Sequence, residues 1–220
     1  MACKGAPPHL EGQGFKAWAG LDLSKSRDMS SLIVLVDTED GKLWCKGYHW
    51  YPIETATERQ QSYRMPLLNW GRDGHLELCP GGVIDYEAIM DRIRHVAREF
   101  NLVGVWFDPM ACGWGEQVLE RQDGIQMGAL KQSIQYLSPG TCKILELCAS
   151  KQLQHDGDPV LRAALQGSRS YTDCNANTRL DRKRSDGLID PAMALVMAVS
   201  NWMTSETTSA YETQQLRIFG

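Results

Sequence analysis

Three apolar segments near the N-terminus are joined by connections too short to contain a helix. They span residues 16–24, 30–38 and 42–53, and the turn between the second and third has the sequence EDG. Parallel neighbours need a crossover of about a dozen residues or more, so these neighbours must pair antiparallel. The segments therefore predict a three-strand antiparallel meander, which constrains the first part of the fold.

The rest of the chain alternates between helices and strands. Residues 85–100 carry an apolar stripe at helical spacing behind Asp85, which suits an N-cap, and residues 102–108 read as a strand buried on both faces. A long apolar helix follows Asp190. The other expected elements are helices over 54–65, 116–121, 141–153 and 159–166, and strands over 126–130 and 169–173. We expect an α/β fold with a mixed sheet, the meander plus parallel strands, flanked by helices.

This order of elements is similar to the ribonuclease H-like arrangement. In that arrangement the first and fourth strands lie side by side and the last helix packs across them. With 220 residues, the chain suits one domain that folds unaided. We expect a lead-in over residues 1–15, the domain over 16–205 and a flexible tail over 206–220.

Bulk properties restrict the class of protein. No apolar run reaches the length of a membrane span and the N-terminus lacks a signal-peptide core, so we expect a cytoplasmic protein with no membrane partner. Seven cysteines without a C-x-x-C pair argue against a zinc site or disulfide framework. The net charge of −4 disfavours a dedicated nucleic-acid-binding module. It does not exclude a nuclease, because metal-holding carboxylates lower the formal charge.

Three aspartates occupy the ends of predicted elements. Asp22 and Asp108 end apolar strands, and Asp190 opens the last helix. Side-by-side first and fourth strands would bring Asp22 and Asp108 together, and Asp190 would arrive from the helix. Carboxylate oxygens suit Mg²⁺ or Mn²⁺, and the usual chemistry of such a cup is phosphodiester hydrolysis by two metal ions.

Each aspartate also has a structural explanation. Asp22 is the hardest to explain in that way, because Asp is depleted in strands and a buried charge needs a partner. Asp108 precedes Pro109 and could begin a turn, whereas Asp190 precedes Pro191 and could cap a helix. The metal hypothesis therefore depends on the three aspartates together.

Two further groups are candidates for the same site. Asp28 precedes the second strand and could add a metal ligand, although an ordinary turn aspartate would look the same. A basic cluster lies just before the last helix and comprises Arg179, Arg182, Lys183 and Arg184. Alone it reads as a solvated loop. Beside a metal site, we expect it to contact DNA phosphates.

Six stretches recur in a family's order over nearly the whole chain. They are HLEGQGFKAWAGLDLSKSRDMSSL, the W-G-x-x-G-x-L segment with CPGGVID, VWFDP, SPG with KILE, HDGDPVL, and RKRSDGLIDPAMALVMA. Together they resemble the nuclease domain of phage terminase large subunits, the motors that package and cut viral DNA. The family's metal-binding aspartates fall on Asp22, Asp108 and Asp190. This chain departs from the family at Pro191, where Gly is common.

The resemblance implies a two-metal endonuclease that cuts double-stranded viral DNA in the host cytoplasm with Mg²⁺ or Mn²⁺. The implied partners are the terminase ATPase domain, the small terminase subunit and the portal or procapsid. The sequence contains no G-x-x-x-x-G-K-[ST] phosphate loop, so we expect no ATP hydrolysis from this chain.

Other functions remain open from sequence. Another ribonuclease H-like enzyme, such as a junction resolvase or ribonuclease H, would share the fold and the carboxylates. A sugar-kinase or actin-like ATPase shares the pattern of GLDLSKS but needs a second Gly-rich phosphate loop, for which DPMACGWG is a poor substitute. A non-catalytic DNA-docking module for packaging would bind metal without cleaving.

Overall fold

The computed structural model describes residues 3–5, 14–24, 27–62, 65–110 and 115–218, with side chains as far as residue 206. Its strands are β1 (Lys16–Asp22), β2 (Ser30–Asp37), β3 (Leu43–Pro52), β4 (Glu77–Cys79), β5 (Asn101–Phe107), β6 (Met127–Ala129), β7 (Leu153–His155), β8 (Ser170–Thr172) and β9 (Thr178–Leu180). Its helices are α1 (Ile53–Arg59), α2 (Leu67–Arg72), α3 (Tyr86–Glu99), α4 (Gly115–Arg121), α5 (Ile134–Ala149), α6 (Pro159–Gly167) and α7 (Asp190–Ile218).

The first seven strands form one mixed sheet in the order β4-β3-β2-β1-β5-β6, with β7 also paired to β3. The predicted meander is confirmed, since β1 pairs antiparallel with β2 and β2 pairs antiparallel with β3. Strand β5 lies parallel to β1, with Leu21 opposite Phe107. Because Asp22 and Asp108 are the next residues of the two strands, both reach the same edge of the sheet. The predicted α/β fold class is therefore confirmed.

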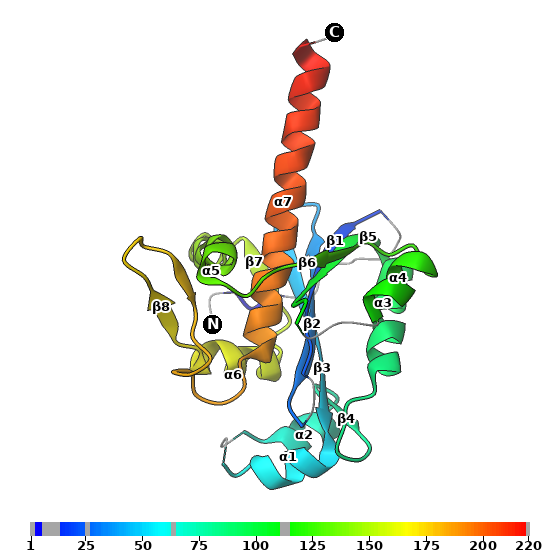
Figure 1. Ribbon diagram of the computed structural model, residues 1–220, viewed down its shortest axis with the longest axis vertical. Helices are drawn as coiled ribbons and strands as arrows, with labels where there is room; N and C mark the ends of the chain where they lie inside the picture. The colour runs from blue at the N-terminus through cyan, green and yellow to red at the C-terminus, as the bar shows by residue number, and fades with distance from the viewer. Residues whose placement is uncertain (1–2, 6–13, 25–26, 63–64, 111–114, 219–220) are drawn as a thin grey trace.

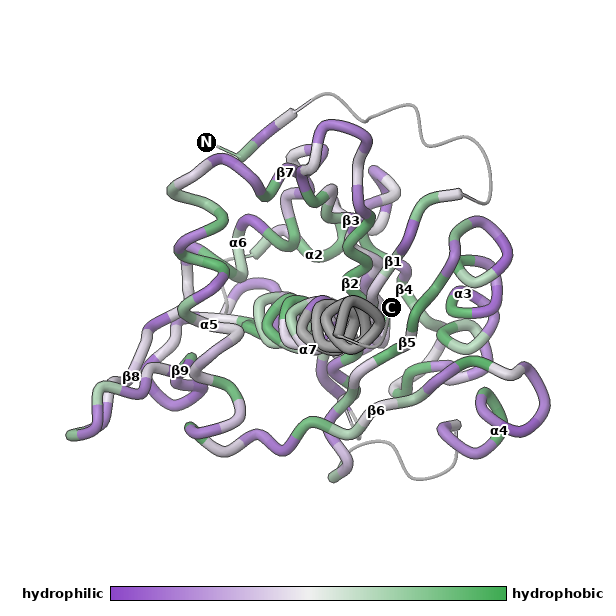
Figure 2. The backbone as a smooth tube through the Cα atoms, turned by 90° about the horizontal axis from the view of Figure 1, so that it is seen from above, coloured by the Kyte–Doolittle hydropathy of each residue, from purple (hydrophilic) through white to green (hydrophobic). Residues whose placement is uncertain are grey.

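Helices cover both faces of the sheet. Helices α5, α6 and α7 lie on one side and α3 and α4 on the other (Figure 1), and α7, seen nearly end-on from above, lies near the middle of the molecule (Figure 2). Alternation along β1 divides the core accordingly. Ala17, Ala19 and Leu21 pack in the cluster that contains α3, whereas Trp18 packs in the cluster that contains α7.

Helix α7 lies unusually close to β1. A Cβ atom added to Gly20 would lie only 2.1 Å from the Ala194 carbonyl oxygen, so this contact requires glycine. Further along the helix, the buried Asn201 amide donates to the carbonyl oxygens of Ala19 (3.2 Å) and Gly104 (2.9 Å). The helix is thereby fixed to both strands that carry candidate metal ligands.

Several elements differ from the sequence-based expectation. Helix α5 begins at Ile134, before Pro139, rather than near residue 141, and strands β4, β7 and β9 were not predicted. The lead-in contributes to the sheet, because Lys4 forms a bridge with His155. Helix α7 continues to Ile218, through most of the segment expected as a tail. The domain limits at residues 16 and 205 stay predictions.

Two smaller findings complete the fold. The Asp85 carboxylate accepts a hydrogen bond from the Glu87 amide (3.0 Å), as expected of the N-cap of α3. None of the described helices combines the length and the apolar character that crossing a bilayer requires.

Candidate metal centre

The three predicted carboxylates come from three elements that meet at one edge of the sheet. Asp22 is the last residue of β1, Asp108 follows β5, and Asp190 is the first residue of α7. Asp22 and Asp190 are buried, with exposed fractions of only 2% and 6%, whereas Asp108 is half-buried. The structure thus gathers residues that are up to 168 positions apart in sequence (190 − 22).

Arg182 connects two of these carboxylates. Its Nη1 donates to Asp190 Oδ1 at 2.8 Å, and its Nη2 donates to Asp22 Oδ2. The Arg182 side chain is 45% exposed, so its guanidinium covers the buried acids from the solvent side. One monovalent group therefore bridges two carboxylates.

The pKa of Asp22 shows that Arg182 compensates the negative charge of the carboxylates only in part. Burial raises the pKa of Asp22, the Asp190 carboxylate raises it further, and Asp108 adds a smaller increase. Arg182 opposes these effects, but the pKa of Asp22 still reaches about 7. The negative charges of Asp190 and Asp108 disfavour ionisation of the buried Asp22. A divalent cation would reduce the repulsion among these carboxylates more than a single guanidinium does.

The donor chemistry of the centre fits a hard divalent cation, because all three candidate ligands are carboxylates. Across the ranges that the structure describes, however, no three His, Cys, Asp or Glu side chains lie close enough to hold a metal ion together. Arg182 joins Asp22 to Asp190, and Asp108 Oδ1 accepts a hydrogen bond from the Met110 amide (3.0 Å). The ligand types fit, but the carboxylates do not yet surround a common point.

Asp28 lies beside this centre. Its Oδ1 accepts from the Met29 amide (3.1 Å) and lies 3.9 Å from Arg59 Nη1. Burial and the charge of Asp190 raise the pKa of Asp28. The carboxylate is thus electrostatically coupled to the centre, but the amide and the arginine hold it.

The predicted basic cluster lines a cavity of about 370 Å³ next to the carboxylates. Arg179, Arg182, Lys183 and Arg184 all contribute to its wall. The Arg184 guanidinium lies 5.8 Å from the centre of the Tyr171 ring, which also lines the cavity. Three basic residues besides Arg182 therefore surround a space large enough for a phosphate group.

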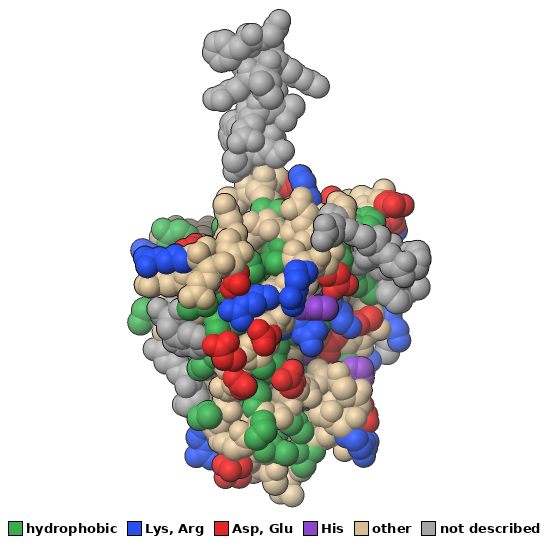
Figure 3. All heavy atoms as spheres, turned by 90° about the vertical axis from the view of Figure 1, so that its right-hand side faces the viewer, with side chains coloured by type: hydrophobic (Ala, Val, Ile, Leu, Met, Phe, Trp, Pro, Cys, Tyr) green, Lys and Arg blue, Asp and Glu red, His purple; other side chains and the backbone are tan. Residues whose placement is uncertain are grey.

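On the side that carries α3 and α4, acidic and basic side chains are intermixed (Figure 3). A mixed-sign surface provides little field to attract a polyanion. The basic cavity near the carboxylates is consequently the better candidate for contact with DNA.

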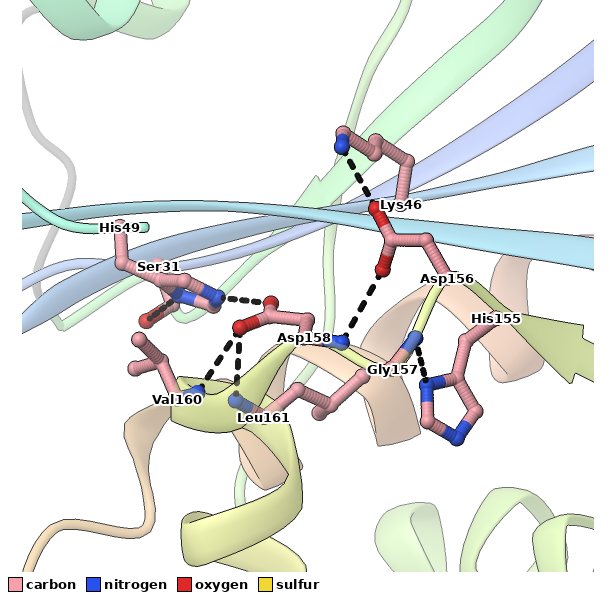
Figure 4. A network of polar contacts seen from close by, with 9 residues as sticks. All are labelled: Ser31, Lys46, His49, His155, Asp156, Gly157, Asp158, Val160 and Leu161. Carbon is pink, nitrogen blue, oxygen red and sulfur yellow. Dashed lines mark hydrogen bonds and ion pairs between the residues drawn. The ribbon is translucent and has the colours of Figure 1, made fainter. Parts of the chain in front are cut away.

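The sequence did not reveal a second polar network, which Figure 4 shows. Ser31 and His49 of this network lie on the same sheet face as Asp22, because the register pairs Ser31 with both Asp22 and His49. His49 Nε2 is 2.8 Å from Asp158 Oδ2, and His49 Nδ1 is 3.0 Å from Ser31 Oγ. Asp158 Oδ1 also accepts from the amides of Val160 (2.8 Å) and Leu161 (3.4 Å) at the start of α6.

This network resembles a hydrolase triad in composition only. Ser31 is completely buried and His49 is 3% exposed, so the hydroxyl cannot reach a substrate. In the sheet register Ser31 lies opposite both Asp22 and His49, which places the network directly behind the carboxylate edge. Asp158 before Pro159 is a recognisable N-cap signal, but nothing local marks His49 as its partner.

Comparison with known proteins shows the family of the chain. The model of a family described as "Terminase large subunit, endonuclease domain" matches residues 3–206. The chain belongs to this family. A curated relative, the terminase large subunit of Enterobacteria phage HK97, is 27% identical over 188 residues, or 84% of this chain. The chain spans 37% of the length of that relative.

Solved structures give the same result. The crystal structure of the HK97 bacteriophage large terminase matches with a TM-score of 0.77 and 26% identity, over 87% of this chain and 41% of that one. The large terminase nuclease from thermophilic phage G20c matches with a TM-score of 0.55 over 90% of this chain and 85% of that one. At 16% identity, this second match supports the ribonuclease H-like fold alone.

Proposed function

We propose that this chain is a metal-dependent endonuclease that cleaves double-stranded viral DNA during genome packaging. The observation that carries the proposal is the convergence of Asp22, Asp108 and Asp190 at one sheet edge, beside a basic cavity. Membership of the terminase endonuclease family supports the same reaction.

In this proposal Asp22, Asp108 and Asp190 hold two Mg²⁺ or Mn²⁺ ions. The G20c nuclease, a structural neighbour, has been solved with bound magnesium. When bound, such ions activate a water molecule and stabilise the leaving 3′-oxygen. Asp22, from β1 between β2 and β5, would be one of the carboxylates that hold these ions.

The chain's own residues position the DNA. Arg179, Lys183 and Arg184 line the cavity and would bind backbone phosphates there. Phosphate contacts fix the register of a duplex without reading bases, so this arrangement provides little sequence preference. The ATPase domain, small subunit and portal are proposed partners, as the family resemblance implies.

The test is nicking of supercoiled plasmid DNA in Mn²⁺ by the wild type and Asp22→Asn. We expect the variant to lose at least about a hundredfold in rate, because a metal ligand is lost. Asp186→Asn is the matched control, since Asp186 precedes α7 but is exposed and pairs with Arg169 at 2.9 Å. It should cleave like the wild type.

Other outcomes would select other functions. Unchanged nicking by Asp22→Asn refutes the assignment of the centre. Mn²⁺ binding by the wild type without cleavage of any DNA supports a non-catalytic docking module. Strong preference for four-way junctions over linear duplex indicates a junction resolvase.

A further inference from the structure

Arg182 occupies the position in which a cation would be expected. Its guanidinium donates to both Asp22 and Asp190, which are the two most buried of the three candidate ligands. The guanidinium thus lies between two acids that would otherwise repel each other.

A metal ion needs the same oxygens. A divalent cation shared by Asp22 and Asp190 would take over the oxygens that now accept hydrogen bonds from Arg182, and two cations at one place repel. The guanidinium has somewhere to go, because its side chain is 45% exposed and lines the basic cavity beside Arg179 and Lys183. Moving it there shifts one partly exposed side chain that already lines this cavity.

We propose that Arg182 is a positioning residue that substitutes for the divalent cation in the metal-free protein and moves into the basic cavity when metal binds. The inference rests on the proposed function, because it uses the same carboxylates. In the cavity Arg182 would join Arg179, Lys183 and Arg184 as a phosphate contact. Metal occupancy and the basic surface offered to DNA would then be coupled through one side chain.

The consequence for metal affinity is specific. A protein whose binding-competent state is only partly populated binds its ligand more weakly by that fraction. Removing Arg182 should therefore tighten Mn²⁺ binding. If Arg182 only supported the structure of the site, its removal would weaken Mn²⁺ binding. The direction of the change separates the two roles.

The experiment is isothermal titration of Mn²⁺ into DNA-free protein at one mildly alkaline pH. We expect the apparent Kd for Mn²⁺ of Arg182→Ala to be about tenfold lower than that of wild type. The Kd of Arg182→Lys should fall less, because lysine keeps the positive charge but lacks the two parallel N–H donors of the guanidinium. Lys183→Ala is the matched control. It removes one positive charge from the same loop, and its apparent Kd should stay within about twofold of wild type.

Thermal unfolding provides a second readout that needs no activity. In EDTA, Arg182→Ala should unfold at a lower temperature than wild type, because two buried carboxylates lose their common partner. Adding Mn²⁺ should raise the unfolding temperature of the variant more than that of the wild type.

An unchanged or weaker Mn²⁺ affinity in Arg182→Ala overturns this inference, even if the wild type cleaves DNA in Mn²⁺ and the proposed function holds. Failure of the proposed function looks different. In that case the wild type neither cleaves DNA in Mn²⁺ nor loses Mn²⁺ affinity on Asp190→Asn, and the inference falls with it.

Discussion

Two buried carboxylates on the same face of the sheet, Asp158 and Asp22, have different numbers of hydrogen-bond donors and opposite shifts in pKa. Asp158 accepts from the Val160 and Leu161 amides and pairs with His49, whose Nε2 faces it as the donor. Burial raises its pKa, but these hydrogen bonds outweigh burial and hold the pKa below its usual value. Asp22 shares one guanidinium with a second acid, and its pKa rises to about 7.

We infer from this difference that Asp158 serves structure, and Asp22 stays the proposed metal ligand. A carboxylate with a full set of donors is an anchor, here for the start of α6 against β3. A carboxylate left with too little positive charge is stable only because the fold forces it there, and such positions concentrate at functional sites. The contrast between Asp158 and Asp22 therefore supports the metal centre without reference to relatives.

The largest effect should come from the glycine that brings α7 against the Asp22 strand. In Gly20→Ala the new methyl group would meet backbone atoms, namely the Ala194 carbonyl oxygen and the Ala198 nitrogen at 2.1 and 2.3 Å. We expect a loss of about 3 kcal/mol or more in unfolding free energy, measured by urea denaturation, because α7 must move away from β1.

Gly47→Ala is the corresponding change at the Asp158 network. Its methyl group would meet the ends of side chains, Asp158 Oδ2 at 2.5 Å and His49 Nε2 at 2.6 Å. Side chains can shift where a backbone cannot, so the loss should be smaller. A larger loss of unfolding free energy for Gly47→Ala than for Gly20→Ala would contradict the close packing of α7 against β1.

The next largest effect should follow removal of the anchor. Asp158→Ala deletes the cap of α6 and leaves the buried His49 without its carboxylate, so we expect a loss of about 2–3 kcal/mol in urea denaturation. Asp85→Ala is the control, because Asp85 caps α3 through the Glu87 amide alone. That variant should lose about 1 kcal/mol. Equal losses would show that His49 adds nothing.

Local pattern was enough to predict the frame that carries the site. The short connections after residues 16–24 and 30–38 required the meander, and the apolar run before Asp108 marked the buried strand beside it. The Asp85 cap and the apolar stripe behind it predicted α3. The convergence of the three aspartates followed from this topology.

What the sequence did not reveal depends on contacts between distant residues. Strands β4 and β7 have three residues each, too few to show alternation, and they exist because β3 offers them an edge. Helix α5 begins before Pro139 although a proline in the second turn is unfavourable, because Leu137 packs in the cluster that contains α7 and Ser138 Oγ accepts from the Thr178 amide of β9. Arg182 read as one of several loop cations, since its partner Asp22 is 160 residues away.

The smallest loss of stability should come from changing Asp22 itself. At neutral pH in EDTA, Asp22→Asn should be at least as stable as wild type, because Asn retains an acceptor for Arg182 and removes the repulsion with Asp190. The pH dependence sharpens this expectation. Since the folded pKa of Asp22 is about 7 against 3.8 in the unfolded chain, its contribution to stability is complete below about pH 3.8 and is lost as the pH rises through 7.

Asn does not titrate, so the stability of Asp22→Asn relative to wild type should increase between about pH 4 and pH 7, as measured by urea denaturation at each pH. Asp158 has the opposite sign. Its lowered pKa means that its contribution is present above 3.8 and is lost as the pH falls below that value, so Asp158→Asn should gain relative stability only in acid. If Asp22→Asn instead lost as much stability at neutral pH as Asp158→Ala, Asp22 would be a second structural anchor. A metal ligand at this position must release Arg182 to accept the ion. An acid whose contact with Arg182 the fold requires is therefore a poor candidate for such a ligand.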